Sequence, residues 1–498
     1  MTTEVDIYLT DGRAALITRE DGDSLQALRD LGDMLMAPAA GEGPQLARRL
    51  NEVGQLAHAA QAPLAQLAKD YIKADRAGAA ALQKADVDAA TDFIEKLGIA
   101  YFDLLRQVQT YVPGWREVRE HVPLLVAQAY RALSMQFKWQ LLSYRAVDRD
   151  LWVLAARLWN YAEDRSLEAI RVDLPAGRHT TVRREYLKPL MLAISSVESL
   201  PPADTDIAER IIDWLSPTFE LHRHPAKGCY FQVDVDAGSA PTRYFAGMRL
   251  RGGQRFFGPA GGLEKLDAAA AAIAEQGRLP DGLHIEDADL EQVIEVFGHL
   301  STHWGARRPG RREERKRSVA LIGVVPGYEN LIERVGAEEA VDLAEDPGVE
   351  IWKVENESEG GYGVTLPFDQ SEWVRVGSVM AVRAADARTW SVGIVRRLAA
   401  RDDEQRYVGI ELLARGARVV PLQPDTGGDE RQAVLLPSHV GDSVSHGEVS
   451  LLLPAGGFTS KVVLRMQFHG QTYLIEPRML LENGVDYDLA YYRISRRL

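Results

Sequence analysis

Hydrophobic spacing in the first 220 residues is typical of amphipathic helices. Alanine and leucine dominate, and apolar residues recur three and four positions apart, which places them on one side of a helix. One such face contains Val126, Tyr130, Leu133, Phe137, Leu141 and Tyr144, and a second contains Leu151, Leu154, Ala155, Leu158 and Tyr161. The pattern predicts helical hairpins packed on one another. No fixed period repeats, so it does not predict a solenoid.

The spacing changes near Pro225. Residues Cys229–Asp236 alternate between apolar and polar like a strand, and we expect Arg243–Leu250 to pair with them. Helical spacing returns over Leu263–Glu275 and Ala288–Trp304. We therefore expect residues 1–305 to be mostly helical, as one domain or two, with a small β insertion near 229–250.

Residues 306–317 are predicted to form a basic linker. Seven of the eleven residues from Arg307 to Arg317 are Lys or Arg, and Pro309-Gly310 disfavours a regular element there.

After this linker the apolar period becomes two, which predicts strands. The predicted strands are Ser318–Val325, Trp352–Glu355, Gly363–Leu366, Ser378–Val382, Ser391–Leu398 and Tyr407–Leu412. A helical insertion over 329–344 interrupts them. Short strands joined by Gly, Asp and Asn predict a small barrel or sandwich over 318–420. We expect the polar stretch Gln423–Arg431 to separate it from a second β-rich unit, 432–498, with strands at 448–453, 461–468, 471–476 and 488–494.

Composition narrows the functional classes. With 46% apolar and 26% charged residues the chain can bury several cores. Its net charge, 58 − 72 = −14, disfavours binding to phosphate polymers unless positive charge is clustered locally. A single cysteine, Cys229, excludes an internal disulfide and a cysteine-based zinc cluster. No apolar run reaches the roughly 18 residues of a membrane span, and the acidic start lacks the layout of a signal peptide. We therefore expect a cytoplasmic protein without membrane insertion.

Two motifs flank the first strand of the predicted barrel. Arg311 and Arg315 form an R-x-x-x-R spacing, which Arg308 and Arg312 repeat; Asn356, Ser358 and Gly361 form an N-x-S-x-x-G spacing. A guanidinium group grips phosphate or a base edge through paired hydrogen bonds and stacks on aromatic rings. Asn356 and Ser358, two apart, face one side of a strand, and glycine permits close approach of a ligand. Together the motifs predict a binding site for a ligand that carries both an anionic group and a base.

In this order the motifs resemble those of PilZ domains, bacterial receptors for cyclic di-GMP. Three later segments resemble strands of the same family: Val376–Val379, Trp390–Arg397 and Tyr407–Leu412. The resemblance covers Arg307–Leu412. It implies an α+β multidomain protein, in which a large, mostly helical N-terminal region precedes a six-stranded PilZ-like β-barrel and a second, small β-rich unit.

The resemblance also implies roles for the motif residues. Arg311 and Arg315 would grip phosphate and stack on guanine, Asn356 and Ser358 would hydrogen-bond to the guanine or the ribose-phosphate, and Gly361 would allow close approach. Arg308 and Arg312 offer a second register, and Arg317 lies nearest to the strand. Arg315 and Asn356 are 41 positions apart, beyond the family's usual two dozen or so, because of the helical insertion.

The function that this resemblance implies is a receptor rather than an enzyme, with cyclic di-GMP as its ligand and no cofactor. Ligand capture would change the domain arrangement or the binding of an unknown protein partner through the helical region. The alternative is a protein-interaction scaffold whose degenerate PilZ-like barrel does not bind nucleotide. Binding of single-stranded nucleic acid by the β units is not expected, because the chain is acidic and only 8% of its residues are aromatic.

Three other motifs have simpler interpretations. Gly22-Asp23-Ser24-Leu25 matches the nucleophile block of a hydrolase class, but charged residues precede it and a helix N-cap fits better. His222 and His224 face one side of an extended stretch without an evident third metal ligand. Phe256 and Phe257, beside Arg255, fit core packing. Neither a Walker-type phosphate loop nor a dinucleotide-binding glycine motif is present.

Overall fold

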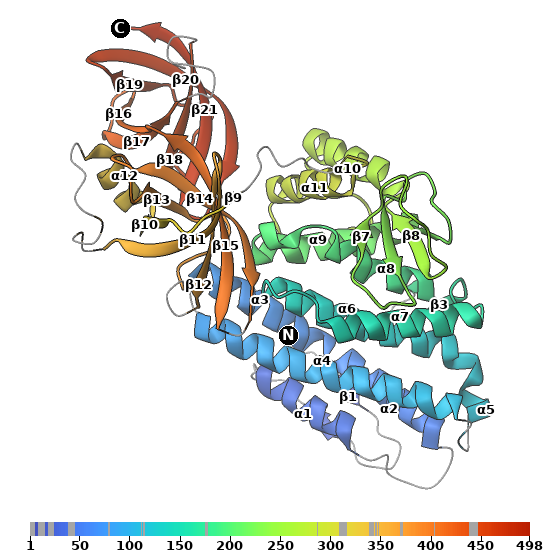
Figure 1. Ribbon diagram of the computed structural model, residues 1–498. Helices are drawn as coiled ribbons and strands as arrows, with labels where there is room; N and C mark the ends of the chain where they lie inside the picture. Colours follow the sequence, from blue (N-terminus) through green and yellow to red (C-terminus); the bar gives the residue numbers. More distant parts are fainter. Residues whose placement is uncertain are drawn as a thin grey trace. The chain divides into compact units, whose positions relative to one another are not determined.

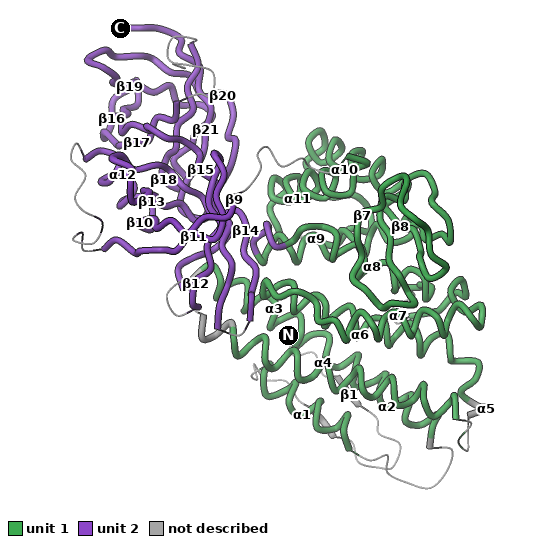
Figure 2. The backbone as a smooth tube through the Cα atoms, in the orientation of Figure 1, with its two compact units in different colours: residues 1–197, 202–310 green, residues 198–201, 311–498 purple. Residues whose placement is uncertain are grey.

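The chain forms two compact units (Figure 2): unit 1 contains residues 1–197 and 202–310, and unit 2 contains 198–201 and 311–498. The computed structural model describes residues 5–7, 15–17, 24–37, 45–77, 80–110, 112, 115–174, 178–285, 287–307, 316–337, 343, 346, 348–368, 372–402, 404–437 and 447–498.

Unit 1 is mainly helical (Figure 1). Its helices are α1 (Ser24–Met36), α2 (Gln45–Ala59), α3 (Gln61–Ala77), α4 (Ala80–Gln109), α5 (Trp115–Val118), α6 (Val122–Leu142), α7 (Arg149–Asp164), α8 (Val182–Ala193), α9 (Pro202–Leu215), α10 (Gly262–Gln276) and α11 (Leu290–Trp304), with 3₁₀ turns η1 (Arg119–His121), η3 (Val197–Ser199) and η4 (Ser216–Thr218). Two short antiparallel strand pairs also belong to unit 1. They are β1 (Val5–Ile7) with β2 (Ala15–Ile17), and β3 (Arg171–Asp173) with β4 (His179–Thr181).

Large aromatic side chains fill the helix contacts of unit 1. Tyr130 and Phe137 of α6 are fully buried, as their spacing predicts. On α7 the buried face is rotated from the predicted one, because Trp152 and Trp159 take the core positions; the Trp159 ring stacks on Tyr186 with centroids 4.7 Å apart. Indole rings bury more surface than leucine, so they decide which face of α7 packs inward.

A four-stranded antiparallel sheet lies within unit 1. Its strand order is β5 (Glu220–His222), β8 (Gln254–Gly258), β6 (Phe231–Asp234), β7 (Thr242–Arg243). The predicted β insertion is therefore present and larger than expected. Of the predicted strand Arg243–Leu250 only Arg243 pairs with β6, and the chain that follows runs as an exposed loop.

The first barrel of unit 2 has six strands. They are β10 (Leu321–Pro326), β11 (Glu350–Ser358), β12 (Gly361–Pro367), β13 (Val379–Ala384), β14 (Ser391–Ala400) and β15 (Gln405–Arg415). The sheet order is β10-β13-β14-β15-β12-β11, and pairing of β10 with β11 closes it. The two-residue strand β9 (Lys316–Arg317) pairs with Asn356 and Glu357 of β11, beyond the residues of β11 that pair with β10. The predicted six-stranded barrel is confirmed.

The second β-rich part is also a closed barrel. Its strands are β16 (Arg418–Pro424), β17 (Arg431–Leu436), β18 (Glu448–Pro454), β19 (Leu464–Phe468), β20 (Gln471–Asn483) and β21 (Tyr487–Arg497), in the order β16-β17-β18-β21-β20-β19. The polar stretch Gln423–Arg431 lies inside this barrel, as the end of β16, the turn and the start of β17. It does not separate the two β-rich parts, because a polar hairpin turn and a linker have the same composition.

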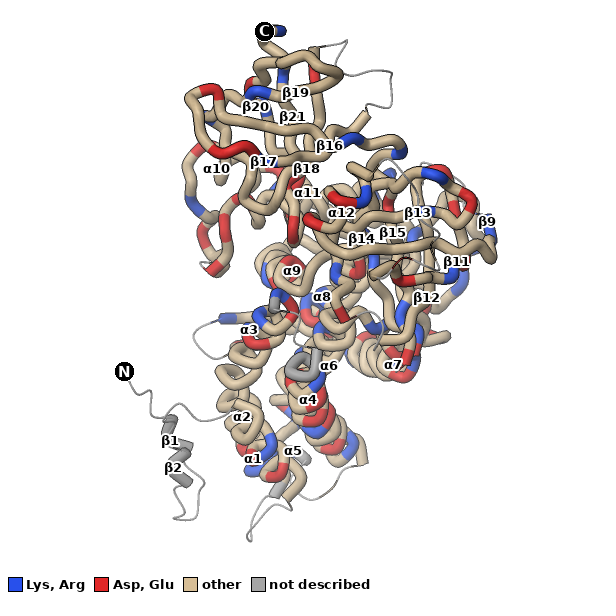
Figure 3. Tube along the Cα trace, turned by 90° about the vertical axis from the view of Figure 1, so that its left-hand side faces the viewer, with Lys and Arg blue, Asp and Glu red and all other residues tan. Residues whose placement is uncertain are grey.

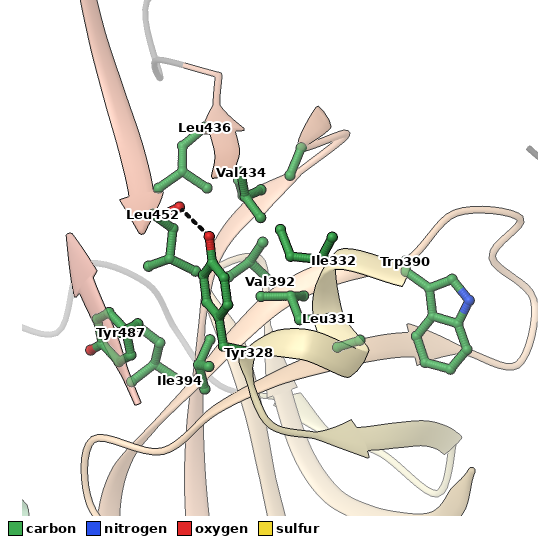
Figure 4. Close-up of a cluster of buried hydrophobic side chains, with 14 of the residues drawn as sticks. Tyr328, Leu331, Ile332, Trp390, Val392, Ile394, Val434, Leu436, Leu452 and Tyr487 are labelled. Carbon is green, nitrogen blue, oxygen red and sulfur yellow. Dashed lines mark hydrogen bonds between the residues drawn. The ribbon is translucent and has the colours of Figure 1, made fainter. Parts of the chain in front are cut away.

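The two barrels share a hydrophobic core. Helix α12 (Tyr328–Gly336), the described part of the predicted insertion 329–344, contributes Tyr328 and Leu331 to it. These side chains pack against Val392 of the first barrel and Leu452 of the second (Figure 4). The Tyr328 hydroxyl lies 3.1 Å from the carbonyl oxygens of Gln432 and Leu452 and donates to them. The insertion therefore joins the barrels.

Charge is mixed by sign over the surface of the chain. Acidic and basic positions are interspersed, for example along α4 (Figure 3). Among the helices that the structure describes, none combines the length and the apolar composition needed to cross a bilayer.

Candidate functional site

One row of residues crosses the outer face of the first barrel. Arg317 on β9, Asn356 on β11, Gly363 on β12, Gly409 on β15 and Arg397 on β14 are successive Cα partners across four strand pairs. Directly paired residues share a face of a sheet, so all five belong to one side. At about 4.8 Å per strand, the row spans roughly 19 Å between the two arginine Cα atoms. Arginines therefore stand at both ends of the row, and Arg397 forms an ion pair with Glu198 at 3.3 Å.

The barrel core fixes which way this row faces. Val364 and Val408, which flank Gly363 and Gly409 along their strands, are fully buried inside the barrel. Because neighbours in a strand point to opposite faces, the row of glycines faces outward. A β-bulge between Val354 and Asn356 shifts the register of β11 at this point. Without that extra residue Asn356 would face the core, so the bulge aims its amide at the outer face.

The two central positions of the row are glycines, and a side chain would not fit freely at either. A Cβ atom on Gly363 would lie 2.6 Å from Asn356 Oδ1 and 2.7 Å from Nδ2, and against the hydroxyl of Tyr407. A Cβ on Gly409 would lie 3.3 Å from the Cβ of Arg397 and 3.7 Å from a ring carbon of Tyr407. The amide of Asn356, the phenol of Tyr407 and the stem of Arg397 therefore cover the two glycines, both of which are buried.

Tyr407, which pairs with Thr365, reaches over both glycines from the side away from the β11–β12 turn. Its ring carries the Arg401 guanidinium at 5.2 Å from the centroid, a cation–π contact, and Arg401 pairs with Glu355 at 2.9 Å. The phenol is only 9% exposed, so it is held in place by packing. Tyr407 is therefore an ordered part of this face.

The second motif lies on β11 and at the β11–β12 turn. Ser358 pairs with Gly361 and Asn356 with Gly363, so the serine and asparagine side chains share the outer face, two residues apart on β11. A Cβ on Gly361 would press against the carbonyl oxygen of Ile410, so only glycine fits this position at the turn. The motif residues Asn356, Ser358 and Gly361 are thus brought together.

The first motif falls outside the residues that the structure describes. Arg308, Arg311, Arg312 and Arg315 all lie in the segment 308–315. The two residues that follow are described: Lys316 pairs with Glu357, and Arg317 with Asn356. The chain therefore leaves the arginine segment directly beside the second motif.

Sequence reasoning did not assign site roles to Gly363, Gly409, Tyr407 and Arg397. The signal for two of them was present: Gly363 and Gly409 are glycines inside strands, where a missing side chain commonly marks a close backbone approach. The row itself depends on strand pairing between distant segments, which no local pattern reveals.

The helical insertion does not lie over this face in its described part. Helix α12 places Leu331 and Ile332 in the core between the barrels, against Val379 and Val434. A scaffold with its site covered by the insertion would place this helix across Ser358. Residues Tyr328–Gly336 instead leave the outer face of β11 and β12 uncovered.

A cavity of about 1020 Å³ lies in unit 1, lined by residues of α3, α6, α8 and α9. Its charged walls are paired with each other. Lys138 Nζ lies 2.6 Å from Asp206 Oδ1, Arg210 contacts the same carboxylate at 2.8 Å, and Lys188 contacts Asp213 at 2.9 Å. These charges therefore satisfy one another within the walls of the cavity.

Comparison with known proteins gives two family matches. Residues 13–226 match the model described as "Cyclic-di-GMP receptor FimW, N-terminal domain", and residues 329–418 match "Cyclic-di-GMP receptor FimW, middle PilZ domain". No curated protein matches the chain.

Among solved structures the chain is similar to the Borreliella burgdorferi PlzA protein, in a crystal structure in complex with c-di-GMP. The identity is 8%, the match covers 37% of this chain and 89% of that chain, and the TM-score is 0.15. A likeness this weak assigns nothing beyond the two family models. Those models match most of the helical region and most of the first barrel. The chain is therefore a PilZ-domain protein, with its PilZ barrel preceded by a FimW-type helical region.

Proposed function

We propose that this protein is a non-enzymatic receptor for cyclic di-GMP and that it binds the ligand on the outer face of the PilZ barrel. The observation that carries the proposal is the row in which Asn356, Gly363 and Gly409 lie between two arginines, Arg317 and Arg397, on the outer face. The amide of Asn356 and the hydroxyl of Ser358 match the hydrogen-bonding edge of a guanine ring. The family models, both described as cyclic-di-GMP receptor domains, support the same ligand.

The arginine segment supplies the positive charge that two phosphates need. Lys316 pairs with Glu357, and the next residue of β11 toward the β11–β12 turn is Ser358, which pairs with Gly361. We propose that ligand binding extends the β9 ladder by one residue, so that Arg315 pairs with Ser358. Arg311 lies four residues earlier, within roughly 13 Å of extended chain. The two guanidinium groups can then grip different parts of one ligand.

Capture of the ligand would fix the segment 308–315 against the barrel. This segment connects unit 1, which ends at residue 310, with unit 2, which resumes at 311. A ligand that binds one arrangement of this connection more tightly than another shifts the population of unit arrangements by that difference in affinity. We propose that the helical region then binds or releases a protein partner.

Calorimetry with cyclic di-GMP tests the site. We expect heat and saturation with the wild-type protein and a loss of at least 100-fold in affinity for the double variant Arg311→Ala/Arg315→Ala. The double variant Arg493→Ala/Arg496→Ala, which removes two exposed arginines from β21 of the second barrel, is the matched control and should bind normally. Equal heat from wild type and the first variant would refute the assigned arginines. Absence of heat from the wild type would refute the receptor and favour the scaffold.

Fluorescence energy transfer tests the coupling separately. One dye on α4 of unit 1 and one on β20 of unit 2 should change their transfer efficiency when cyclic di-GMP is added at saturating concentration. The Arg311→Ala/Arg315→Ala variant should show no change. Binding without a change in transfer would leave the ligand site intact and overturn the proposed rearrangement.

A further inference from the structure

A sulfur, a nitrogen and an oxygen ligand converge at one edge of the four-stranded sheet in unit 1. The carboxylate of Glu220, the imidazole of His222 and the thiol of Cys229 place one ligand atom each within 4.8 Å of one another. Glu220 and His222 are two apart on β5, and Leu221 between them is buried on the other side. The two side chains therefore share the face toward which Cys229 is brought.

The backbone around Cys229 is built for this close approach. Gly258 of β8 is the Cα partner of Glu220, and a Cβ on it would lie 2.9 Å from Cys229 Cα and against the carbonyl oxygen of Gly228. Gly228 has a φ of +81°, a left-handed conformation that favours glycine. A turn from Ala226, whose carbonyl oxygen accepts from Cys229 N at 3.2 Å, completes the support. The backbone packed around Cys229 thus holds its short side chain in place.

Access and charge also suit a cation. The side chains of His222 and Glu220 are 42% and 52% exposed, and their Nε2 and Oε2 atoms are 2.8 Å apart, whereas Cys229 is 3% exposed. One ligand is therefore anchored in the protein and two lie at the solvent edge. Arg223, the next residue after His222, pairs with Glu163 at 3.2 Å, so its positive charge is engaged away from the cluster.

We propose that Glu220, His222 and Cys229 form a three-ligand site for Zn²⁺ or a similar borderline transition-metal ion. Ligand atoms on a tetrahedral zinc, with bonds of about 2.0–2.3 Å, lie roughly 3.5 Å apart, so side-chain movements of about 1 Å close the cluster around an ion. Thiolate and imidazole ligands select such ions over Mg²⁺ and Ca²⁺, which prefer oxygen. Three protein ligands leave a fourth position open at the exposed edge, the arrangement of zinc sites that take water or an external ligand.

The sequence alone places His222 and His224 on one side of an extended stretch without an evident third metal ligand. The proposed site draws its further ligand from the segment before β6 of the same sheet. That ligand is Cys229, seven residues after His222, because the strand pairing of β5 with β8 and the tight turn at Gly228 bring the thiol to the face of β5. A single cysteine excludes a cysteine-rich cluster but not a mixed site.

Cobalt spectroscopy tests the proposal with unusual selectivity, because Cys229 is the single cysteine of the chain. Reduced, untagged protein should bind one equivalent of Co²⁺ with a near-ultraviolet sulfur-to-cobalt band and intense visible bands of tetrahedral geometry, and Zn²⁺ should bleach both. Cys229→Ser, or Cys229→Ala if the serine variant does not fold, should abolish the sulfur band. His222→Gln and Glu220→Gln should each weaken Co²⁺ binding by at least 10-fold. His224→Gln, an exposed imidazole two residues away, is the matched control and should bind like the wild type.

Three other results would each contradict the proposed site. No sulfur band in the wild type near one equivalent of Co²⁺ means that the thiol does not ligate. A band that persists unchanged in His222→Gln and Glu220→Gln means that the cysteine acts alone. A band that Zn²⁺ does not bleach means that the site does not take zinc. Circular dichroism and melting curves of each variant establish that it is folded before its spectrum is read.

Discussion

Arg396 of the PilZ barrel forms a two-pronged ion pair with Glu482 of the second barrel. Its Nη2 atom lies 2.8 Å from Glu482 Oε2, its Nη1 atom contacts Oε1 of the same carboxylate, and its Nε atom lies 2.7 Å from Glu411. The hydroxyl of Tyr487 donates to Glu482 as well. Burial alone would lower the pKa of Arg396, but the hydrogen bonds and charge of Glu482 raise it overall. One guanidinium therefore satisfies carboxylates on both barrels.

Removal of the charge of Glu482 should loosen the contact between the barrels. Glu482→Gln leaves the partly buried guanidinium of Arg396 with one carboxylate in place of two. We expect a loss of about 1–3 kcal/mol in the free energy of unfolding of unit 2, which is smaller than for a fully buried pair because both side chains are about a third exposed. Urea denaturation, followed by a probe in the barrels, measures it.

The matched control is Glu476→Gln on the same strand, which should change the unfolding free energy by less than about 0.5 kcal/mol. The double variant Arg396→Gln/Glu482→Gln should be less destabilised than the sum of the single variants, because the residues interact. Additive effects would contradict a direct ion pair.

The hydroxyl of Tyr328 should stabilise the joint core of the barrels. Tyr328→Phe keeps the ring in the core but leaves the carbonyl oxygens of Gln432 and Leu452 without this donor. We expect a destabilisation of about 1–2 kcal/mol in urea denaturation. Tyr473→Phe, a half-buried tyrosine of β20, is the control and should have little effect. An unchanged midpoint for Tyr328→Phe would show that water replaces the donor.

The elements of the PilZ barrel could be predicted because their signals are local. Val408 and Ile410 alternate with Tyr407 and Gly409, and the structure buries the first pair in the barrel, as period two requires. The spacing of Asn356 and Ser358 likewise placed both on one face. In these cases the strand period alone decides the orientation of a side chain.

The parts that could not be predicted depend on pairing between distant segments. The stretch Gln423–Arg431 is polar whether it is a linker or a hairpin turn, and the pairing of β16 with β17 and β19 decides between them. The row of residues on the outer face depends on Gly363 and Gly409 being paired across β12 and β15. The bulge that turns Asn356 outward could not be predicted from residues 354–356, because it depends on the register in which β11 pairs with β12.

Adjacent residues of β9 allow a sharp test of the proposed ligand face. Arg317 pairs with Asn356 and shares its outer face, whereas Lys316 points the other way, and both are exposed. Arg317→Ala should lower the affinity for cyclic di-GMP by about 10–100-fold, the range for a lost charge-assisted hydrogen bond. Calorimetry at fixed ionic strength measures the change.

Lys316→Ala is the control for this test, because it removes the same charge from the opposite face of the same strand. Its affinity should stay within about 3-fold of the wild type, which is the effect expected from long-range charge alone. Equal losses for the two variants would show that only the overall charge matters. A loss confined to Lys316→Ala would place the ligand on the other face.

The stability of unit 1 should depend on pH through His303. Burial, together with the nearby His299 ring at 4.4 Å between centroids and the charge of Arg243, lowers the pKa of His303 to about 4. An unfolded histidine titrates near 6.5, so between these values the unfolded chain binds the proton and the folded chain does not. Stability from this group is therefore complete above pH 6.5 and is lost as the pH falls toward 4. The resulting loss in the free energy of unfolding is about 1–3 kcal/mol, given roughly 1.4 kcal/mol per pKa unit and partial exposure.

His303→Gln should flatten the fall in urea midpoint between pH 6.5 and 4. His58→Gln, which replaces an exposed histidine of α2, is the control and should leave the fall unchanged. If wild type and His303→Gln lose stability in parallel between pH 6.5 and 4, another group carries the dependence.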